Sequence, residues 1–244
     1  MIRLSVNINK IATLRNARGG DIPNVLEAAI NAQRFGAQGI TVHPRPDERH
    51  IRYADVYEIR PHITTEFNIE GYPSDRFMQL ILDVKPHQVT LVPDPPDAIT
   101  SNAGWDTKKH KKFLSEIVQI LKDHGIRPSI FVDADTEMIK HAADTGTIRI
   151  ELYTEPYAKL YPVDKWRAIK PFVQAAEYAR KIGLELNAGH DLNLQNLNFL
   201  ARKIPYLKEV SIGHALISDS IYFGFENTIQ MYRRQLEWNV PVVD

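Results

Sequence analysis

The 244-residue sequence predicts an α/β fold, a (β/α)8 TIM barrel with extra helices, on the basis of three observations. Short β-rich runs alternate with longer helical patterns from one end of the chain to the other. Several of these runs are continuous apolar stretches, which are typical of parallel strands covered on both faces. The length is close to the roughly 250 residues of a single barrel. We therefore expect one domain that spans residues 1–244.

Eight strand-like runs follow one another along the chain. They occupy residues 3–8, 39–43, 66–70, 88–92, 129–133, 149–153, 185–188 and 209–212. The longest amphipathic stretches between and after them, with apolar residues at helical spacing, are residues 24–35, 109–124, 164–182 and 216–238. Strict alternation over the whole length favours a closed barrel over an open doubly wound sheet. A Gly-x-Gly-x-x-Gly motif does not follow the first strand, which further disfavours a dinucleotide-binding sheet.

Three segments depart from a minimal barrel. Residues 93–108 form a long connection rich in Pro, Asp, Asn and Gly, which favours a functional loop such as a lid. Residues 154–164 carry tyrosines before the next helix begins, and either an added helical turn or a subunit contact would explain them. The C-terminal helix has more aromatic residues than one core-facing stripe needs, so we expect a subunit contact there, with burial inside the monomer as the alternative. These aromatic residues are Tyr222, Phe223, Phe225, Tyr232 and Trp238.

Composition narrows the possible functions. The chain is 43% hydrophobic and 25% charged, which is ordinary for a globular protein. Its 30 basic and 30 acidic residues balance, so the net charge gives no reason to expect nucleic acid or an anionic membrane as a partner. The absence of cysteine excludes disulfides, thiolate metal sites and a cysteine nucleophile. The chain starts in a strand pattern without a signal peptide or a membrane-spanning run, so we expect a cytoplasmic protein.

Ionisable side chains cluster at the predicted carboxyl ends of the strands, where barrel enzymes place their active sites. His43, His190 and His214 follow three different strands. Glu70 and Glu151 occupy strand positions where apolar residues are expected, so each needs a partner, and a structural ion pair is the simpler alternative. An unpaired polar group in a covered site costs free energy, so this concentration favours a catalytic barrel. By contrast, Asp135 is expected to cap the helix that follows it.

Basic and glycine-containing loops at the same rim indicate phosphate binding. Residues 189–190 and 213–214 follow the last two strands, where backbone N–H groups commonly bind phosphate in this fold. Residues 45–50 form a second cationic cluster and residues 18–20 a third basic element. Two separated anion sites would suit two phosphorylated groups.

Two other barrel chemistries fit the sequence less well. A Schiff-base aldolase needs a lysine inside a strand, but the nearest lysine to the rim is Lys10, just beyond the first strand. A metal-dependent hydrolase usually carries His-x-His on the first strand, where this chain has Asn7-Ile8-Asn9. A metal gathered by the rim histidines and glutamates remains a minor alternative.

Taken in order, the motifs resemble those of the pyridoxine 5′-phosphate synthase family. The matching segments are residues 6–8, 11–19, 39–43, 49–51, 85–87, 91–93, 133–135, 187–190 and 212–215. The second of them, Ile-Ala-Thr-Leu-Arg-Asn-Ala-Arg-Gly, is long and highly specific. The resemblance implies that 3-amino-2-oxopropyl phosphate condenses with 1-deoxy-D-xylulose 5-phosphate to give pyridoxine 5′-phosphate, inorganic phosphate and water. It implies no metal or organic cofactor, and a homo-oligomer, an octamer, as the assembly.

The resemblance also implies a role for each matching position. His43, Glu70 and His190 would be the acid–base residues, and Glu151 would stabilise cationic intermediates. A carboxylate such as Glu70 beside a histidine would raise the basicity of that histidine. The substrate-holding residues would be Asn7, Arg18, Asp191, Gly213 and His214 for the amino-ketone phosphate, and Asn9, Lys10, Arg45, His50 and Thr100 for the deoxyxylulose phosphate.

The chain departs from the family pattern in two places. Asn9-Lys10 stands where the pattern has Asp-His, and Asp191 stands where it has glycine. A backbone contact at position 191 would survive this change. Two alternatives remain open: another cofactor-free lyase or isomerase acting on a sugar phosphate, which would not need two phosphate sites, and a non-catalytic barrel that binds phosphorylated metabolites without turnover.

Overall fold

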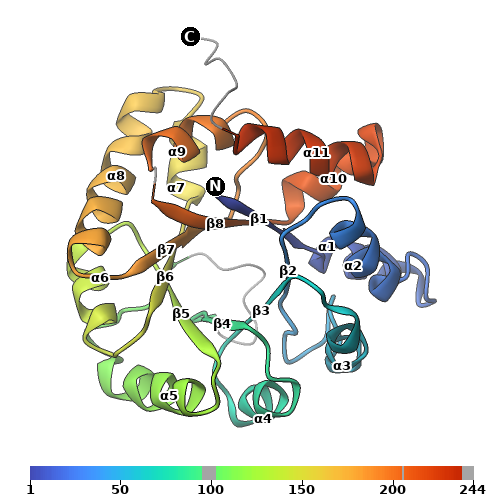
Figure 1. Ribbon diagram of the computed structural model, residues 1–244, viewed down its shortest axis with the longest axis horizontal. Helices are drawn as coiled ribbons and strands as arrows, with labels where there is room; N and C mark the ends of the chain where they lie inside the picture. The colour runs from blue at the N-terminus through green and yellow to red at the C-terminus, as the bar shows by residue number, and fades with distance from the viewer. Residues whose placement is uncertain (95–102, 205, 238–244) are drawn as a thin grey trace.

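Eight parallel strands close into a barrel in sequence order, and helices surround it in the computed structural model (Figure 1), which describes residues 1–94, 103–204 and 206–237. The strands are β1 (Arg3–Asn7), β2 (Gly39–Val42), β3 (Glu66–Gly71), β4 (Gln88–Leu91), β5 (Arg127–Val132), β6 (Arg149–Leu152), β7 (Glu185–Ala188) and β8 (Leu207–Ile212). Closure comes from the pairing of β1 with β8, in which Arg3 lies opposite Glu209. The predicted fold class is confirmed, and the predicted strand ends differ from the observed ones by at most two residues.

The helices follow the strands around the outside of the barrel. They are α1 (Asn9–Arg18), α2 (Val25–Arg34), α3 (Tyr53–Ile59), α4 (Asp75–Val84), α5 (Lys111–Asp123), α6 (Thr136–Ala143), α7 (Glu155–Leu160), α8 (Lys165–Lys181), α9 (Leu197–Lys203), α10 (His214–Phe223) and α11 (Phe225–Gln235), with a short 3-10 helix η1 (Arg60–His62). Asp135 caps α6 as predicted, because its carboxylate accepts hydrogen bonds from the backbone N–H groups of Glu137 and Met138. Helix α7 is the added helical turn that was one of the two interpretations of residues 154–164.

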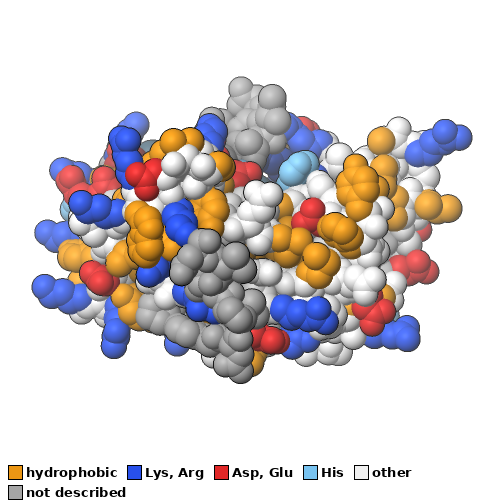
Figure 2. Space-filling model, turned by 90° about the horizontal axis from the view of Figure 1, so that it is seen from above, with side chains coloured by type: hydrophobic (Ala, Val, Ile, Leu, Met, Phe, Trp, Pro, Cys, Tyr) orange, Lys and Arg blue, Asp and Glu red, His pale blue; other side chains and the backbone are white. Residues whose placement is uncertain are grey.

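The C-terminal region is two helices, so the prediction of one helix over residues 216–238 is wrong. Gly224 adopts φ +77°, a left-handed conformation that ends α10 and turns the chain into α11. Tyr232 is buried inside the monomer and its hydroxyl donates to Asp219 at 2.8 Å. Ile221 and Tyr222 of α10 are 76% and 83% exposed, and hydrophobic side chains gather over this end of the molecule in Figure 2. Of the aromatic residues in this region, Tyr232 is therefore buried and Tyr222 is exposed. Trp238 lies outside the described residues.

The barrel strands alternate between polar side chains inside and apolar side chains outside, which corrects the expectation of apolar cover on both faces. In β1 Leu4 and Val6 are fully buried against the outer helices, whereas Ser5 lies inside the barrel, where its hydroxyl is 2.7 Å from that of Thr41. The Thr90 hydroxyl donates to Asn68 Oδ1 at 3.1 Å in the same layer. These bonds satisfy the hydroxyl groups of Ser5, Thr41 and Thr90, so polar side chains form part of the barrel interior.

An ionic network fills the amino-terminal end of the barrel. Glu66 pairs with Arg3 at 2.8 Å and also with Arg127. Arg149 binds Glu185 at 2.5 Å and donates to the side chain of Gln88 at 2.9 Å. Glu209 lies beside this network without a hydrogen bond to its carboxyl group, 3.5 Å from Arg3 Nε.

The helices bury their apolar faces against the outer surface of the barrel. Phe67 of β3, Leu80 of α4 and Leu114 of α5 are among the buried residues of this layer. Within the described part of the chain, no helix combines the length and apolarity needed to span a bilayer.

Candidate active site

His43 and Glu70 face each other at the carboxyl ends of β2 and β3. His43 Nδ1 lies 3.8 Å from Glu70 Oε2, and both side chains are nearly buried. Burial, reinforced by the charges of Arg45 and other cations, holds the pKa of His43 well below its usual range. Burial, reinforced by Glu151 and Asp94, raises the pKa of Glu70 well above its usual value. The lowered pKa favours the neutral imidazole of His43, and the raised pKa favours the protonated form of Glu70.

His50 lies beside His43, with 6.1 Å between the ring centroids. Burial, together with the charges of Arg45 and Lys10, lowers the pKa of His50 to about 4. Its Nδ1 accepts a hydrogen bond from the backbone N–H of Ile51 at 2.9 Å. The neutral ring therefore carries its proton on Nε2 and can donate it to an oxygen of a bound molecule.

Asn7 and Asn9 connect the ends of β1, β2 and β8. Asn7 Oδ1 accepts from the backbone N–H of Asn9 at 3.0 Å, and Asn9 Oδ1 accepts from that of His43 at 2.9 Å. Gly213 lies so close to Asn7 that a Cβ on it would meet the Asn7 side chain at 3.1 Å. Asn9 therefore positions the main chain of His43, whatever contact it also makes with a substrate.

Glu151 occupies the centre of the barrel below this mouth. It is 4% exposed, and its Oε2 lies 3.5 Å from the hydroxyl of Thr90. Burial raises its pKa to about 7, against the opposing effects of His190, Thr90 and Arg149. The close approach needs glycine at position 189, because a Cβ there would lie 3.1 Å from Glu151 Oε1 and 2.5 Å from the carbonyl oxygen of Ser211.

His190 and Asp191 form the opposite wall of the mouth, after β7. His190 Nδ1 and Asp191 Oδ2 are 2.9 Å apart. The hydrogen bond from His190 holds the pKa of the Asp191 carboxyl below its usual range. Asp191 adopts φ +65°, a left-handed conformation that suits glycine, the residue of the family pattern, and that aspartate tolerates better than most residues.

Two helix N-termini point their backbone N–H groups toward this group of side chains. Helix α1 begins after Ile8 and α10 after Gly213, and neither has an acidic residue in its first turn. The start of α10 has no side-chain cap, whereas Asn7 Oδ1 accepts from the first N–H group of α1. Uncapped N–H groups at the positive end of a helix bind anions, and phosphate above all. Gly213 and His214 therefore lie where the sequence predicted a phosphate site.

The structure adds Asp94 and three apolar residues to the residues that the sequence predicted. The predicted Arg45 is buried and its guanidinium donates to Asp94 at 2.6 Å, so Asp94 fixes that cation at the mouth. Val92, Phe131 and Tyr153 form a separate apolar cluster, and the Tyr153 ring lies 5.6 Å from the ring of His190. Strand alternation could have indicated these three apolar residues, because each follows a buried polar residue by two positions.

Two of the predicted residues stand apart from the group. Arg18 is exposed in the last turn of α1, roughly 14 Å along the helix axis from its first residue. Lys10 is exposed, although its charge reaches His50. Thr100 and half of the expected lid loop lie outside the described residues. Trp105, in the later part of that loop, is held against β5, since its backbone N–H donates to the carbonyl of Phe131 at 2.9 Å.

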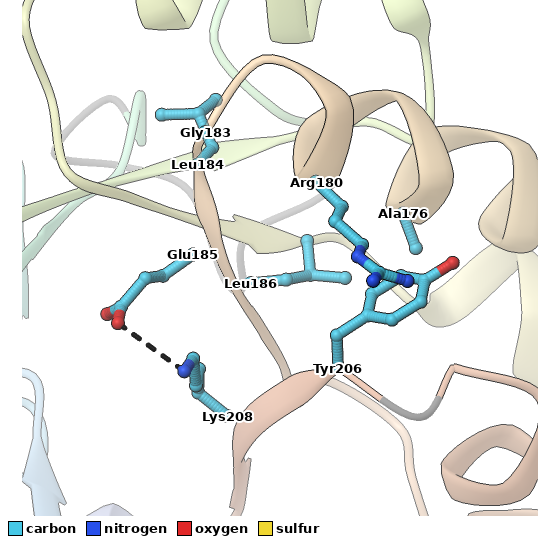
Figure 3. Close-up of a pocket in the computed structure, with 8 residues that line it drawn as sticks. All are labelled: Ala176, Arg180, Gly183, Leu184, Glu185, Leu186, Tyr206 and Lys208. Carbon is cyan, nitrogen blue, oxygen red and sulfur yellow. Dashed lines mark ion pairs between the residues drawn. The ribbon is translucent and has the colours of Figure 1, made fainter.

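Two surface hollows lie at the other end of the barrel. The one in Figure 3 has a volume of about 300 Å³ and lies between α8, the start of β7 and the start of β8, where Glu185 pairs with Lys208 at 3.6 Å. A neighbouring hollow of about 370 Å³ is lined by Arg180, Tyr206 and two other residues of α8. Neither contains the histidines or the inward-facing Glu70 and Glu151, so we place the site at the mouth. Among the described residues, no three His, Asp or Glu side chains are grouped as metal ligands.

Fold and site together define a (β/α)8 barrel whose mouth combines acid–base groups with anion-binding helix ends. Residues 4–238 match the family described as "Pyridoxal phosphate biosynthesis protein PdxJ", and the chain belongs to this family. A relative from Bacteroides thetaiotaomicron named "Pyridoxine 5′-phosphate synthase" is 63% identical over 236 residues, covering 97% of this chain and all of that protein. A relative of the same name from Cytophaga hutchinsonii is 60% identical over 237 residues, with the same coverage.

Solved structures share the fold at low sequence identity. Phosphoribosylanthranilate isomerase from Thermotoga maritima superposes with a TM-score of 0.60 at 15% identity, covering 97% of this chain and 98% of that one. The 3-keto-L-gulonate-6-phosphate decarboxylase from Vibrio cholerae reaches a TM-score of 0.67 at 10% identity, covering 98% and 99%. At this level of sequence identity, the similarities show that the barrel fold is shared.

Proposed function

We propose that this chain is a pyridoxine 5′-phosphate synthase, which condenses 3-amino-2-oxopropyl phosphate with 1-deoxy-D-xylulose 5-phosphate to give pyridoxine 5′-phosphate, phosphate and water. The observation that carries the proposal is the pairing of a histidine whose pKa is lowered with a glutamate whose pKa is raised, 3.8 Å apart, in a mouth beside the uncapped start of α10. Family membership and relatives of this name over nearly the whole chain support it.

His43 and Glu70 act as complementary proton carriers. Imine formation, dehydration and ring closure each need a proton removed at one atom and delivered at another. A buried neutral imidazole accepts a proton, and a carboxylic acid whose pKa is raised donates one at neutral pH. His190, on the far side of the mouth, serves as a third acid–base group.

Glu151 stabilises positive charge on the reacting atoms. Its pKa of about 7 leaves the carboxyl close to balance between its two forms at neutral pH. A cationic iminium intermediate nearby favours the carboxylate, because opposite charges attract strongly away from water. The same carboxyl can then release or take up a proton as that charge appears and disappears.

Two phosphate groups bind at separate parts of the rim. The amino-ketone phosphate binds at the start of α10, through Gly213 and His214, with Asn7 beside them. The sugar phosphate binds near Arg45 and His50, whose side chains lie at the ends of loops after β2. Separate sites keep both substrates in place while their carbons and nitrogen approach.

The assembly and location follow as further parts of the proposal. We assign residues 1–244 to one catalytic domain and place the protein in the cytoplasm. The exposed apolar residues Ile221, Tyr222 and Phe223 of α10 form a face suited to contact with a second copy, so we propose a homo-oligomer, an octamer.

The test is an end-point assay with purified protein, both phosphorylated substrates and a metal chelator, following pyridoxine 5′-phosphate by absorbance and mass. Product in the presence of chelator supports the reaction and shows that no exchangeable metal is needed. Failure to form product, while inorganic phosphate still binds, would instead favour a different sugar-phosphate reaction.

A further inference from the structure

Asp191 carries a carboxylate at a backbone position that suits glycine better. Its φ of +65° costs a residue with a side chain about 1 kcal/mol relative to glycine. A conformation with such a cost persists where the surrounding structure imposes it, and such positions cluster at functional sites. At this one, the side chain is directed to His190 Nδ1 at 2.9 Å.

The direction of that hydrogen bond follows from the charges around Asp191. The hydrogen bond from His190, reinforced by the positive charge of Lys159, holds the pKa of Asp191 below its usual range. An ionised carboxylate accepts hydrogen bonds and donates none, so His190 Nδ1 is the donor. The neutral imidazole then has its proton on Nδ1 and none on Nε2.

Other contacts fix the backbone on both sides of the pair, independently of the Asp191 side chain. The Thr154 hydroxyl donates to the carbonyl of His190, and Asn196 Nδ2 donates to the carbonyl of Asp191 at 3.3 Å. Asn196 is itself held, because its carbonyl accepts from the Tyr157 hydroxyl at 2.7 Å. With the main chain clamped, the carboxylate has the separate effect of orienting the ring.

We propose that Asp191 is a positioning residue for His190, whose carboxylate holds the imidazole in one tautomer and orientation so that Nε2 accepts a proton from the bound substrates. The inference rests on the proposed function, because it takes His190 as one of the acid–base groups of that reaction. The Asp191 carboxylate is not a phosphate ligand, since two anions in contact repel each other. Asp191 acts through His190, in the way that an aspartate orients the histidine of a hydrolase triad.

Two variants at position 191 distinguish a positioning role of the side chain from an effect on the folding of the loop. Asp191→Gly removes the carboxylate and suits φ +65°, so the loop keeps its shape. Asp191→Asn tolerates the same conformation and retains an oxygen that can accept from Nδ1. We expect kcat to fall about 10- to 100-fold in Asp191→Gly, as for other groups that orient a functional histidine, and less in Asp191→Asn. KM for both substrates should stay within about threefold, because substrate contacts are unchanged.

Glu137→Gln is the matched control, because it removes an exposed carboxylate of α6 that pairs only with Lys108 among the contacts found for it. We expect wild-type kcat and KM for this variant. An increase in KM at unchanged kcat in Asp191→Gly would overturn the proposal, because it would show that the side chain contacts substrate directly.

The tautomer of the His190 imidazole ring can be measured directly, as a second test. In protein labelled with 15N-histidine, the imidazole shifts report which nitrogen carries the proton, and a His190→Gln sample assigns the signals. We expect the Nδ1–H form in the wild type and a mixture of tautomers in Asp191→Gly. An unchanged tautomer with wild-type kcat would contradict the positioning role while leaving the reaction in place. A tautomer change in a protein that makes no pyridoxine 5′-phosphate would contradict the reaction and leave the positioning role in place.

Discussion

Burial decides the chemistry of single residues at the mouth of the barrel. His43 and Glu70 are 3.8 Å apart, and transfer out of water lowers the pKa of His43 and raises that of Glu70, because it disfavours the charged form of each. Their positions were predicted from the sequence. Their protonation states were not, because the sequence does not show how much water each group retains.

Substitution of His43 by asparagine tests the acid–base role. Because the lowered pKa of His43 leaves its imidazole neutral at pH 7, His43→Asn changes proton-transfer capacity without changing the charge of the site. We expect kcat to fall by about 10³-fold, within the range for loss of a general base, with substrate dissociation constants within about threefold of wild type. Steady-state kinetics and calorimetric titration measure the two effects. Weakened binding with kcat retained would assign His43 to substrate binding instead.

Loops and helix ends are the elements that build the site, and glycines make their close contacts possible. Gly189, in the loop after β7, packs tightly against the backbone of Ser211. A Cβ placed on Gly189 would lie 2.5 Å from the carbonyl oxygen of Ser211. The sequence predicted that residues 189–190 belong to the rim, but it did not show that Gly189 makes room for the Glu151 carboxyl. The break at Gly224 was missed for a related reason, since the apolar spacing continues through α10 and α11 and conceals the left-handed turn.

Gly189→Ala tests this packing. The new methyl group would collide with a backbone carbonyl and press on Glu151, so we expect a loss of about 1–3 kcal/mol in stability and at least a tenfold fall in kcat. Chemical unfolding measures the loss of stability, and steady-state kinetics measure the fall in kcat. Gly125→Ala is the control for an added methyl group, because the space around Gly125 is open, although its φ of +73° brings a small cost. Wild-type kcat in Gly189→Ala would show that Glu151 does not depend on this contact.

At the scale of the whole molecule, the barrel interior is an ionic and polar assembly within an apolar shell of helices. Glu209 lies in it with 0% exposure, and its Oε2 is 3.5 Å from Arg3 Nε without a hydrogen bond. Burial, reinforced by Glu66, raises the pKa of Glu209 to about 8, against the attraction of Arg3 and Arg149. The folded protein therefore binds a proton at Glu209 over a pH range in which the unfolded chain has released it.

This difference predicts that stability falls as pH rises. Proton binding at Glu209 stabilises the folded protein. This stabilisation is fully present below the pKa of 4.5 that Glu209 has in the unfolded chain, and it is lost as pH rises through the folded-state pKa of about 8. Between pH 5 and pH 9 the loss is on the order of 4 kcal/mol at most. We expect Glu209→Gln to flatten the decline in unfolding free energy over this range, whereas the exposed Glu58→Gln leaves it unchanged. Urea unfolding at several pH values measures the slope, and equal slopes in all three proteins would show that Glu209 does not titrate as described.

The exposed face of α10 leads to a prediction about assembly. Ile221 and Tyr222 present apolar surface to solvent in the single chain, and association would bury it. We expect light scattering to give a mass several times the 27.9 kDa of one chain, and a lower mass for the Ile221→Asp, Tyr222→Asp double variant. An Asp144→Asn variant on the exposed surface of α6 should assemble as the wild type does. A wild-type mass of one chain would contradict the proposed oligomer.

The sequence by itself determined the order of the strands, the closure of the barrel and the position of His43, Glu70 and His190 at strand ends. It could do so because hydrophobic periodicity and βα alternation are local properties of the chain. Tertiary structure alone decided that the strands face a polar interior, that the pKa of His43 is lowered and that of Glu70 raised, that Asp94 fixes Arg45, and that the Asp191 carboxylate binds His190. Each of these depends on distance and on exclusion of water between residues far apart in the chain or on loop conformation, and those quantities exist only once the barrel has closed.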